Sequence, residues 1–201
     1  MMYYYPNRPI LIPPDPENPM NPSPDYINSL EATGKYVAEQ KWNGDNVEIY
    51  TDDLSFWNRK GELHRYQPLP ETKKALKKFP KGAIINLELV NYRTKLIKDF
   101  LLIHSLLAWR GSVLAGKTWG DARLILEDFF ETQHAALDGS GLHLSPVWKS
   151  GFWKLFEEAD GETIEGIILK DPKGKLIISA SKIADVPYML KIRKPSKKYN
   201  F

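Results

Sequence analysis

Two segments of alternating apolar and polar residues, 33–42 and 45–53, flank the dipeptide Asn43-Gly44. Alternation with a period of two predicts strands with one buried face, so we expect two strands separated by a turn. The segments "LSFWNRKGELHR", "AIINLELV" and "FLLIHSLLAWRG" predict three more strands. The segments "IEGIILKDPKGKLIIS" and "YMLKIRKP" predict a final three, the first two joined by a turn at residues 172–174.

Apolar residues recur at helical spacing in three other segments. The segment "LPETKKALKKF" predicts a helix that begins near Pro70, where proline suits the first turn. The segment "TWGDARLILEDFFETQHAAL" predicts the longest helix, and "SGFWKLFEEAD" predicts a shorter one. The expected apolar stripe of the longest helix runs through Leu124, Leu126, Phe129 and Phe130. Because strands outnumber helices and the two kinds mix along the chain, we expect an α+β fold with mainly antiparallel sheets flanked by helices.

The composition sets outer limits on the function. The protein has 201 residues, enough for one domain with its own core, and no cysteine. The lack of cysteine excludes disulfides and thiolate metal sites and agrees with a cytoplasmic location, or the host cytoplasm for a viral protein. No apolar run is long enough to span a bilayer, so we expect no membrane partner. We expect a proline-rich arm over residues 1–25, a folded domain over 26–195 and a basic tail over 196–201.

The net charge of +3 does not by itself indicate nucleic-acid binding. Its distribution permits such binding, because basic residues gather in "ETKKALKKFPKG" and in "KIRKPSKKYNF". Clustered lysine and arginine can follow a phosphate backbone, although runs of this kind also form solvated helix faces and tails.

Lys41 closes the first predicted strand, and Gly44 follows three residues later. A lysine acts as a nucleophile toward phosphorus when burial or neighbouring cations keep its amine neutral. A glycine lets the backbone turn tightly beside a bulky phosphate. The pattern K-x-N-G also fits an ordinary turn, so it needs support from other parts of the chain.

Four further features supply that support. They are Arg59 in "WNRKGEL", Glu88 in "INLELV", Glu165-Gly166 in "IEGIILK", and the pair Lys191 and Arg193 in "YMLKIRKP". A carboxylate in a buried strand costs desolvation energy unless it meets a sugar hydroxyl, a lysine or a metal. An arginine fork suits phosphate or ribose oxygens, and alternation places the two cations of the last strand on one face.

In this order the motifs resemble the covalent nucleotidyltransferase superfamily, which comprises ATP-dependent DNA ligases, RNA ligases and mRNA capping enzymes. The resemblance spans residues 36–194. It implies a nucleotidyltransferase (ATP-grasp-like) ligase catalytic domain over residues 26–195, without the OB domain that usually follows. It also implies an ATP-dependent polynucleotide ligase that uses Mg²⁺, or Mn²⁺, and that acts as a monomer on nucleic acid with 5′-phosphate and 3′-hydroxyl ends.

The resemblance assigns roles to individual residues. Lys41 would attack the α-phosphorus of ATP to form lysine–AMP and release pyrophosphate. The AMP would then pass to a 5′-phosphate and be displaced by a 3′-hydroxyl. Glu88 would hold the ribose hydroxyls, and Glu165 would support the metal. The expected nucleotide-binding residues are Glu39, Gln40, Arg59, Glu88, His104, Glu165, Lys191 and Arg193. The expected nucleic-acid contacts are Asn46, Lys194, Lys197 and Lys198.

Several positions depart from the superfamily pattern. Asn43 replaces the aspartate of DNA ligases and capping enzymes, and Asn46 replaces an arginine common in DNA ligases. This form looks more like nick-sealing RNA ligases, so we favour RNA over DNA as the substrate. Only Ile103 or His104 stands where an aromatic side chain usually stacks on adenine. The alternatives are the catalytic domain of an ATP-dependent DNA ligase, a GTP-using capping enzyme, and a non-catalytic nucleotide- or nucleic-acid-binding module with the same fold.

Overall fold

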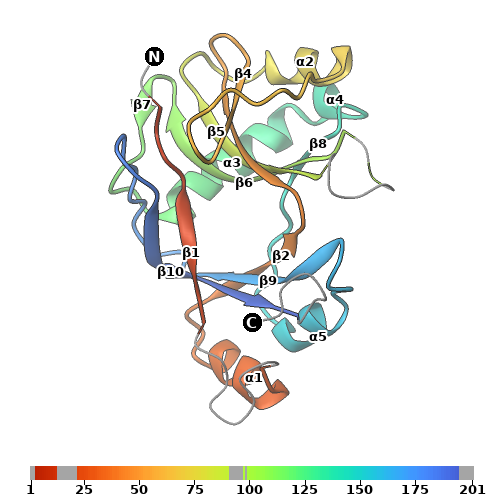
Figure 1. The fold of residues 1–201 in the computed structure, drawn as a ribbon, viewed down its shortest axis with the longest axis vertical. Coiled ribbons are helices and arrows are strands. Elements are labelled where there is room, and N and C mark those ends of the chain that lie inside the picture. The colour runs from red at the N-terminus through yellow and green to blue at the C-terminus, as the bar shows by residue number, and fades with distance from the viewer. Residues whose placement is uncertain (1–2, 13–21, 91–96, 98, 195–201) are drawn as a thin grey trace. The chain divides into compact units, whose positions relative to one another are not determined.

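The computed structural model describes residues 3–12, 22–90, 97 and 99–194. The chain forms two compact units, each with its own mainly antiparallel sheet (Figure 1). The first unit comprises Met1–Asn7, Gly44–Ser145 and Lys175–Ala184. The second unit comprises Arg8–Asn43, Pro146–Gly174 and Asp185–Phe201. The expected α+β class with flanking helices is confirmed.

The first unit holds a sheet with the strand order β4-β3-β5-β6-β7, and β8 pairs with β6 in parallel. Its strands are β3 (Asp45–Tyr50), β4 (Ser55–Asn58), β5 (Ile84–Leu89), β6 (Leu101–Trp109), β7 (Ser112–Val113) and β8 (Leu142–Leu144). Its helices are α2 (Pro70–Leu76), α3 (Trp119–Thr132) and α4 (His134–Leu137). The second unit holds a sheet with the order β1-β10-β9-β2. Its elements are β1 (Asn7–Leu11), α1 (Pro24–Ala32), β2 (Val37–Trp42), α5 (Phe152–Glu157), β9 (Ile164–Lys170) and β10 (Ala184–Arg193).

Helix α3 packs against β6 and begins at a capping box, in which Thr118 and Asp121 bond each other's main-chain N–H. Its buried stripe consists of Trp119, Ala122, Leu126 and Phe129. The expected stripe was wrong in including Leu124, whose side chain is 63% exposed. Leu124 is two residues from Ala122, and a two-residue step turns a side chain to the other side of a helix.

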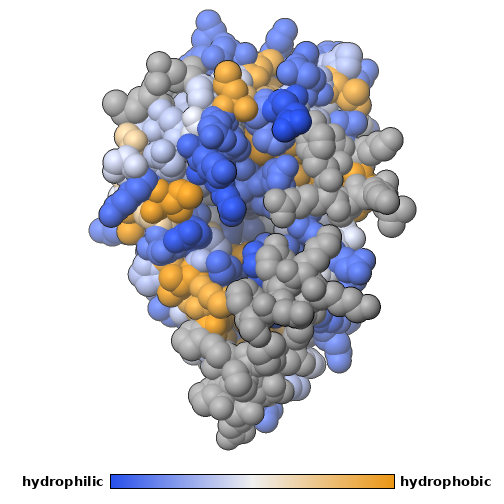
Figure 2. All heavy atoms as spheres, in the orientation of Figure 1, coloured by the Kyte–Doolittle hydropathy of each residue, from blue (hydrophilic) through white to orange (hydrophobic). Residues whose placement is uncertain are grey.

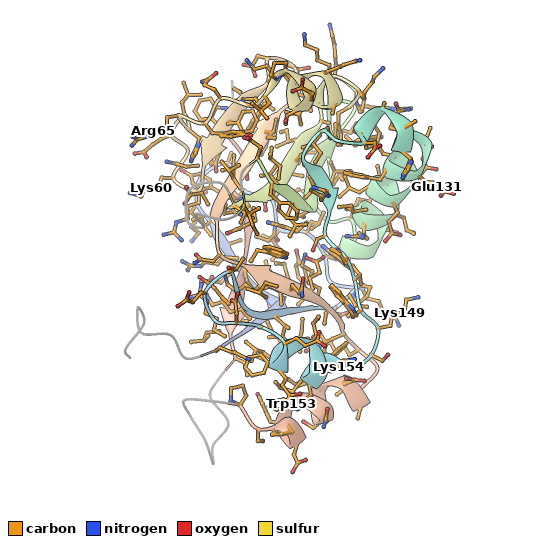
Figure 3. All side chains as sticks on the ribbon, turned by 90° about the vertical axis from the view of Figure 1, so that its right-hand side faces the viewer. Lys60, Arg65, Glu131, Lys149, Trp153 and Lys154 are labelled. Atoms are coloured by element: carbon orange, nitrogen blue, oxygen red, sulfur yellow. The ribbon has the colours of Figure 1, made fainter. Side chains whose placement is uncertain are left out.

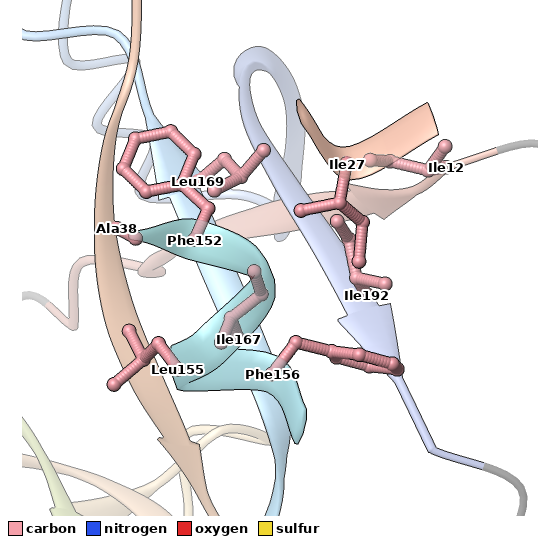
Figure 4. Packing of buried hydrophobic residues seen from close by; sticks show 9 residues of the cluster. All are labelled: Ile12, Ile27, Ala38, Phe152, Leu155, Phe156, Ile167, Leu169 and Ile192. Carbon is pink, nitrogen blue, oxygen red and sulfur yellow. The ribbon is translucent and has the colours of Figure 1, made fainter. Parts of the chain in front are cut away.

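The core of the second unit lies on one face of its sheet, where α1 and α5 pack (Figure 4). The buried cluster consists of Ile12, Ile27, Ala38, Phe152, Leu155, Phe156, Ile167, Leu169 and Ile192. Since side chains alternate along a strand, burial of Ala38, Ile167 and Ile192 directs their neighbours in sequence to the opposite face. That opposite face carries Glu39 and Lys41 of β2, Lys170 of β9, and Lys191 and Arg193 of β10.

The two expected strands on either side of Asn43-Gly44 are confirmed. They do not form a hairpin, because β2 pairs with β9 whereas β3 pairs with β4 and β5. The predicted strand over residues 175–179 is wrong. That segment makes isolated bridges at Lys175 and Ser179, and Leu176 exchanges main-chain hydrogen bonds with the loop before α3. After the turn at residues 171–174 the chain pairs with a loop instead of returning along β9.

Helix α1 was not predicted, because the prolines near the N-terminus argued against regular structure. Pro24 instead occupies the first turn, and the Ser23 side chain accepts a hydrogen bond from the Tyr26 N–H. Strand β1 lies at the edge of its sheet, where its proline is tolerated. On the face drawn in Figure 2, hydrophobic residues form separate patches among hydrophilic ones. Among the described residues, no helix has the length and apolar character needed to cross a membrane.

Candidate active site

Lys41 lies near the end of β2, in a row that runs across three strands. Its Cα is paired with that of Gly166 on β9, which is in turn paired with Arg193 on β10. The Lys41 side chain is 16% exposed, and its Nζ lies 2.5 Å from Oε2 of Glu165. The predicted nucleophile therefore has a carboxylate partner and is largely shielded from solvent.

Glu165 reaches Lys41 because β9 contains an irregularity. Along β9, Ile167 and Leu169 point into the core, so regular alternation would direct Glu165 to the core as well. The register shifts here: Lys41 pairs with Gly166 and Trp42 pairs with Ile164, which leaves Glu165 as the extra residue of a bulge. A bulge redirects a side chain, and here it brings the carboxylate to the face that carries Lys41.

Gly166 is required for this local geometry. Its φ of +150° is rarely adopted by residues with a side chain. A Cβ at this position would lie 2.1 Å from the main-chain oxygen of Ile192, so β9 and β10 could not approach as they do. The close approach of β9 and β10 therefore explains why a glycine follows Glu165 in the sequence motif.

Two cations of β10 complete the group. The Arg193 Nε lies 3.2 Å from the same Glu165 oxygen that contacts Lys41. Lys191 is two residues away on the same face of the strand. Burial, followed by the neighbouring cations Arg193, Lys41 and Arg8, lowers the pKa of Lys191. Lys41, Glu165, Lys191 and Arg193 form what we call the lysine group, in which the positive charges outnumber the negative one. An anionic phosphate would be attracted to it.

Glu39 is buried on the same face of β2, where its Oε2 accepts a hydrogen bond of 2.8 Å from the Lys170 Nζ. The other carboxylate oxygen, Oε1, has no hydrogen-bond partner among the residues that the structure describes. A buried acceptor without a donor costs free energy, and a ligand that donates a hydrogen bond to this oxygen would remove that cost. Gln40 alternates to the opposite face of the strand, so only its main chain is available to a ligand beside Lys41.

The first unit contains a second polar group, on one face of β3, β5 and β6. Glu88 Oε1 accepts a hydrogen bond of 2.9 Å from the Gly44 N–H. A Cβ on Gly44 would lie 2.6 Å from the main-chain oxygen of Leu89, so only glycine allows this approach. Asn46 pairs with Glu88 across the strands. Gly44 and Asn46, the last two fixed residues of the K-x-N-G-x-N motif, therefore both contact β5 at Glu88.

Asn46, Asn86 and His104 form a hydrogen-bonded set on this face. The Asn86 Nδ2 donates to the Asn46 Oδ1 at 3.1 Å, and the Asn46 Nδ2 lies 3.3 Å from the His104 Nε2. His104 is the extra residue of a bulge, because Leu87 pairs with Ile103 and Asn86 pairs with Ser105. Ile103 is fully buried. Of the two candidates for a base contact, only His104 is on the polar face.

The remaining predicted site residues lie elsewhere. Arg59 is exposed at the turn after β4, next to Lys60, which projects from the surface in Figure 3. The Lys194 Nζ donates to the main-chain oxygen of Glu157 at 2.6 Å, where it caps the C-terminal end of α5. Lys197 and Lys198, with the rest of the predicted tail, lie outside the described residues.

Two polar residues of these groups were missed from the sequence: Asn86 and Lys170. Asn86 precedes Glu88 by two positions in an apolar strand, so alternation could have placed both on one face. Lys170 ends the apolar run "GIILK" and is only 2% exposed. A buried lysine needs an anionic partner, but nothing in the sequence identifies that partner as Glu39.

The lysine group offers one carboxylate to a metal, that of Glu165. Among the described residues, no group of three histidine, aspartate or glutamate side chains could hold an ion. Mg²⁺ at phosphoryl-transfer sites is commonly held by one or two carboxylates together with substrate phosphates and water. The residues present therefore fit an ion that binds together with a nucleotide.

Solved structures of ligases resemble this chain, whereas no protein-family model and no curated protein matches the sequence. A Lig E DNA ligase is 12% identical, with 80% of this chain and 62% of that chain covered and a TM-score of 0.56. Mycobacterial DNA ligase D complexed with ATP is 16% identical, with coverages of 79% and 54% and a TM-score of 0.57. Chlorella virus DNA ligase-adenylate is 12% identical, with coverages of 94% and 68% and a TM-score of 0.58.

At such identities the matches show the fold. The expected nucleotidyltransferase fold of ATP-dependent ligases is therefore confirmed. The chain spans 62% of the Lig E structure and 54% of the ligase D structure, so these proteins contain parts with no counterpart here.

Proposed function

We propose that this chain is the adenylyltransferase catalytic domain, over residues 26–195, of an ATP-dependent polynucleotide ligase. The observation that carries the proposal is the lysine group. It sets a shielded amine against one carboxylate and two cations. The fold shared with ATP-dependent DNA ligases supports the same conclusion.

The first step is adenylation of Lys41. Its Nζ attacks the α-phosphorus of ATP, a bond forms between nitrogen and phosphorus, and the bond to the pyrophosphate oxygen breaks. The amine must lose a proton, and Glu165 Oε2 at 2.5 Å is within reach to accept it. Lys191 and Arg193 would stabilise the charge on the phosphate oxygens as the bonds change. The AMP then passes to a 5′-phosphate, and a 3′-hydroxyl displaces it to seal the strand.

The motif match assigns nucleotide contacts to several other residues. Glu88 is assigned to the ribose hydroxyls, Arg59 to phosphate or ribose, and His104 to the base. Glu39 would accept a hydrogen bond through its Oε1, which has no partner among the described residues. Glu165 would hold Mg²⁺ together with the phosphates of ATP. The ion would supply additional stabilisation of the phosphate charge.

RNA is our preferred substrate, because Asn46 replaces the arginine that DNA ligases tend to carry. The amide of Asn46 also lies in a hydrogen-bonded set with Asn86 and His104, which fixes its orientation. DNA is a second candidate, because the similar solved structures are DNA ligases. Nicked duplexes that differ only in RNA or DNA on the 3′-hydroxyl side separate the two. Sealing of only all-DNA nicks contradicts the preference for RNA.

Lys197 and Lys198 of the predicted basic tail are proposed nucleic-acid contacts. Each phosphate contact adds to the salt dependence of binding. Deletion of residues 196–201 should weaken binding of a nicked duplex and flatten its dependence on salt. Unchanged affinity and salt dependence exclude a role for the tail.

Intact mass spectrometry tests the central proposal. The purified protein, incubated with ATP and Mg²⁺, should gain the mass of one AMP, and Lys41→Ala should gain none. Incubation with GTP in place of ATP tests the capping alternative. Absence of any nucleotide adduct on the wild-type protein would favour the non-catalytic module.

A further inference from the structure

Asn43 connects the strand of the proposed nucleophile to the loop before β9. Its Nδ2 donates to the main-chain oxygen of Glu162 at 2.8 Å. Its main-chain N–H donates to the main-chain oxygen of Thr163 at 2.9 Å. Asn43 therefore holds this loop through two adjacent carbonyl groups, and it is two residues away from Lys41.

The loop itself is internally fixed. Oδ1 of Asp160 accepts hydrogen bonds from the main-chain N–H groups of Glu162, Thr163 and Ile164, at 2.8, 2.7 and 2.9 Å. The Gly161 N–H donates to the Ile164 main-chain oxygen at 2.9 Å. These hydrogen bonds hold the loop in one conformation, so the two Asn43 contacts position the whole turn.

The loop leads directly into the bulge that aims Glu165. From the other side, the Lys194 N–H donates to the Glu165 main-chain oxygen at 2.8 Å. Asn43 and Lys194 thus hold the backbone on both sides of the bulge. The 2.5 Å contact between Lys41 and Glu165 depends on this backbone, because both side chains extend from segments that Asn43 joins.

Only a donor can occupy the position of the Asn43 amide. The Glu162 main-chain oxygen is an acceptor, and the amide NH₂ supplies a donor, whereas an ionised carboxylate supplies none. An aspartate here would set negative oxygens against a carbonyl oxygen. Aspartate is nevertheless the residue that DNA ligases and capping enzymes of the resembling superfamily carry at this place.

We propose that Asn43 is a positioning residue, whose amide aligns Lys41 with Glu165, and that aspartate cannot replace it in this chain. The inference rests on the proposed adenylation of Lys41. It predicts that Asn43→Asp, which introduces the residue of DNA ligases and capping enzymes, slows adenylation of Lys41 instead of speeding it. Loss of one hydrogen bond to a main-chain oxygen corresponds to about a tenfold effect.

Single-turnover adenylation, followed by mass spectrometry across a range of pH, tests the proposal. Asn43→Asp should slow lysine adenylation about tenfold near neutral pH, with little change in the KM for ATP. An ionised carboxylate at position 43 cannot donate to Glu162, and an exposed aspartate has an ordinary pKa of about 3.9, so Asn43→Asp should stay slowed from about pH 6 to about pH 8. Asn43→Ala, which also lacks the donor, should be slowed by a similar amount.

Asn28→Asp is the matched control, because Asn28 is exposed on α1 of the same unit and the substitution changes the charge equally. It should behave as wild type at every pH. Equal or faster adenylation by Asn43→Asp overturns the proposal while the ligase function stands. A wild-type protein that takes up no AMP overturns both. If Asn43→Asp fails to fold, Asn43→Ala replaces it, and wild-type rates for Asn43→Ala overturn the proposal.

Discussion

The Lys41 Nζ and the Glu165 Oε2 lie 2.5 Å apart, although strand alternation alone would direct Glu165 into the core. The bulge at Glu165 and the unusual backbone of Gly166 produce this contact. A bulge leaves one residue outside the regular pairing and redirects its side chain. Here it brings the single carboxylate of the lysine group to the amine that we propose is adenylated.

Glu165→Gln should remove the carboxylate while keeping the shape of the side chain. We expect lysine adenylation to fall by about 10²-fold or more, since the substitution removes both the proposed proton acceptor and the proposed metal ligand. The measurement is the rate of AMP adduct formation at saturating ATP. Glu162→Gln is the control, because its side chain is exposed three residues away. Wild-type rates for Glu165→Gln would exclude this role for the carboxylate.

Gly166→Ala should disrupt the pairing of β9 with β10, because the new Cβ would lie 2.1 Å from the Ile192 main-chain oxygen. We expect a loss of about 3 kcal/mol or more in the free energy of unfolding, measured by urea denaturation. Gly151→Ala is the control. Gly151 also has a positive φ, of +76°, but a Cβ added there would have no atom within 4 Å. A similar loss in both variants would mean that φ strain, and not the clash, is responsible.

Elements that bury one regular face could be predicted from periodicity. The long helix α3 is an example, and the position of Lys41 at the end of a strand followed from the alternation before it. Strand β5, buried at five of its six positions, was instead predicted from its continuous apolar run. The pairing of strands could not be predicted in this way. The turn at Asn43-Gly44 resembles a hairpin turn locally, and only long-range pairing assigns its two strands to different sheets.

The candidate site, too, could be predicted only in part from the sequence. The motifs identified Lys41, Glu165 and Arg193, which the structure brings together. The bulges that expose Glu165 and His104 break the alternation on which strand prediction relies, so sequence periodicity alone would misplace both side chains. Ion pairs such as Glu39 with Lys170 join residues far apart in the chain, and a single sequence contains no signal for such contacts.

Lys170→Met should be strongly destabilising, because it leaves the Glu39 carboxylate buried without its cation. Removal of one partner of a buried ion pair typically costs about 3–5 kcal/mol. The double variant Glu39→Gln with Lys170→Met should recover much of that loss, since no charge stays buried. Urea denaturation of the wild type, both single variants and the double variant gives the coupling energy. Losses that simply add would show that the pair contributes no interaction of its own.

Glu48 should make the protein less stable as the pH rises. The side chain is 1% exposed on β3, and burial raises the pKa of Glu48 to about 9 from an ordinary value near 4.5. The neighbouring Tyr3 hydroxyl, which donates to the Asn58 main-chain oxygen, counteracts this shift only in part. Below the ordinary pKa, Glu48 is protonated in both the folded and the unfolded state, so it contributes no pH dependence there.

Between pH 4.5 and 9 the unfolded chain loses the Glu48 proton while the folded protein keeps it. The unfolded state therefore binds fewer protons, and the free energy of unfolding falls with rising pH, by up to about 1.4 kcal/mol per pH unit from this group. Glu48→Gln should remove that slope and make the protein more stable than wild type near pH 8. Glu62→Gln, an exposed position in the same unit, should leave the slope unchanged. Parallel stability curves for wild type and Glu48→Gln would show that Glu48 is ionised in the folded protein, and the carboxylate would then need a cation or donor beside it.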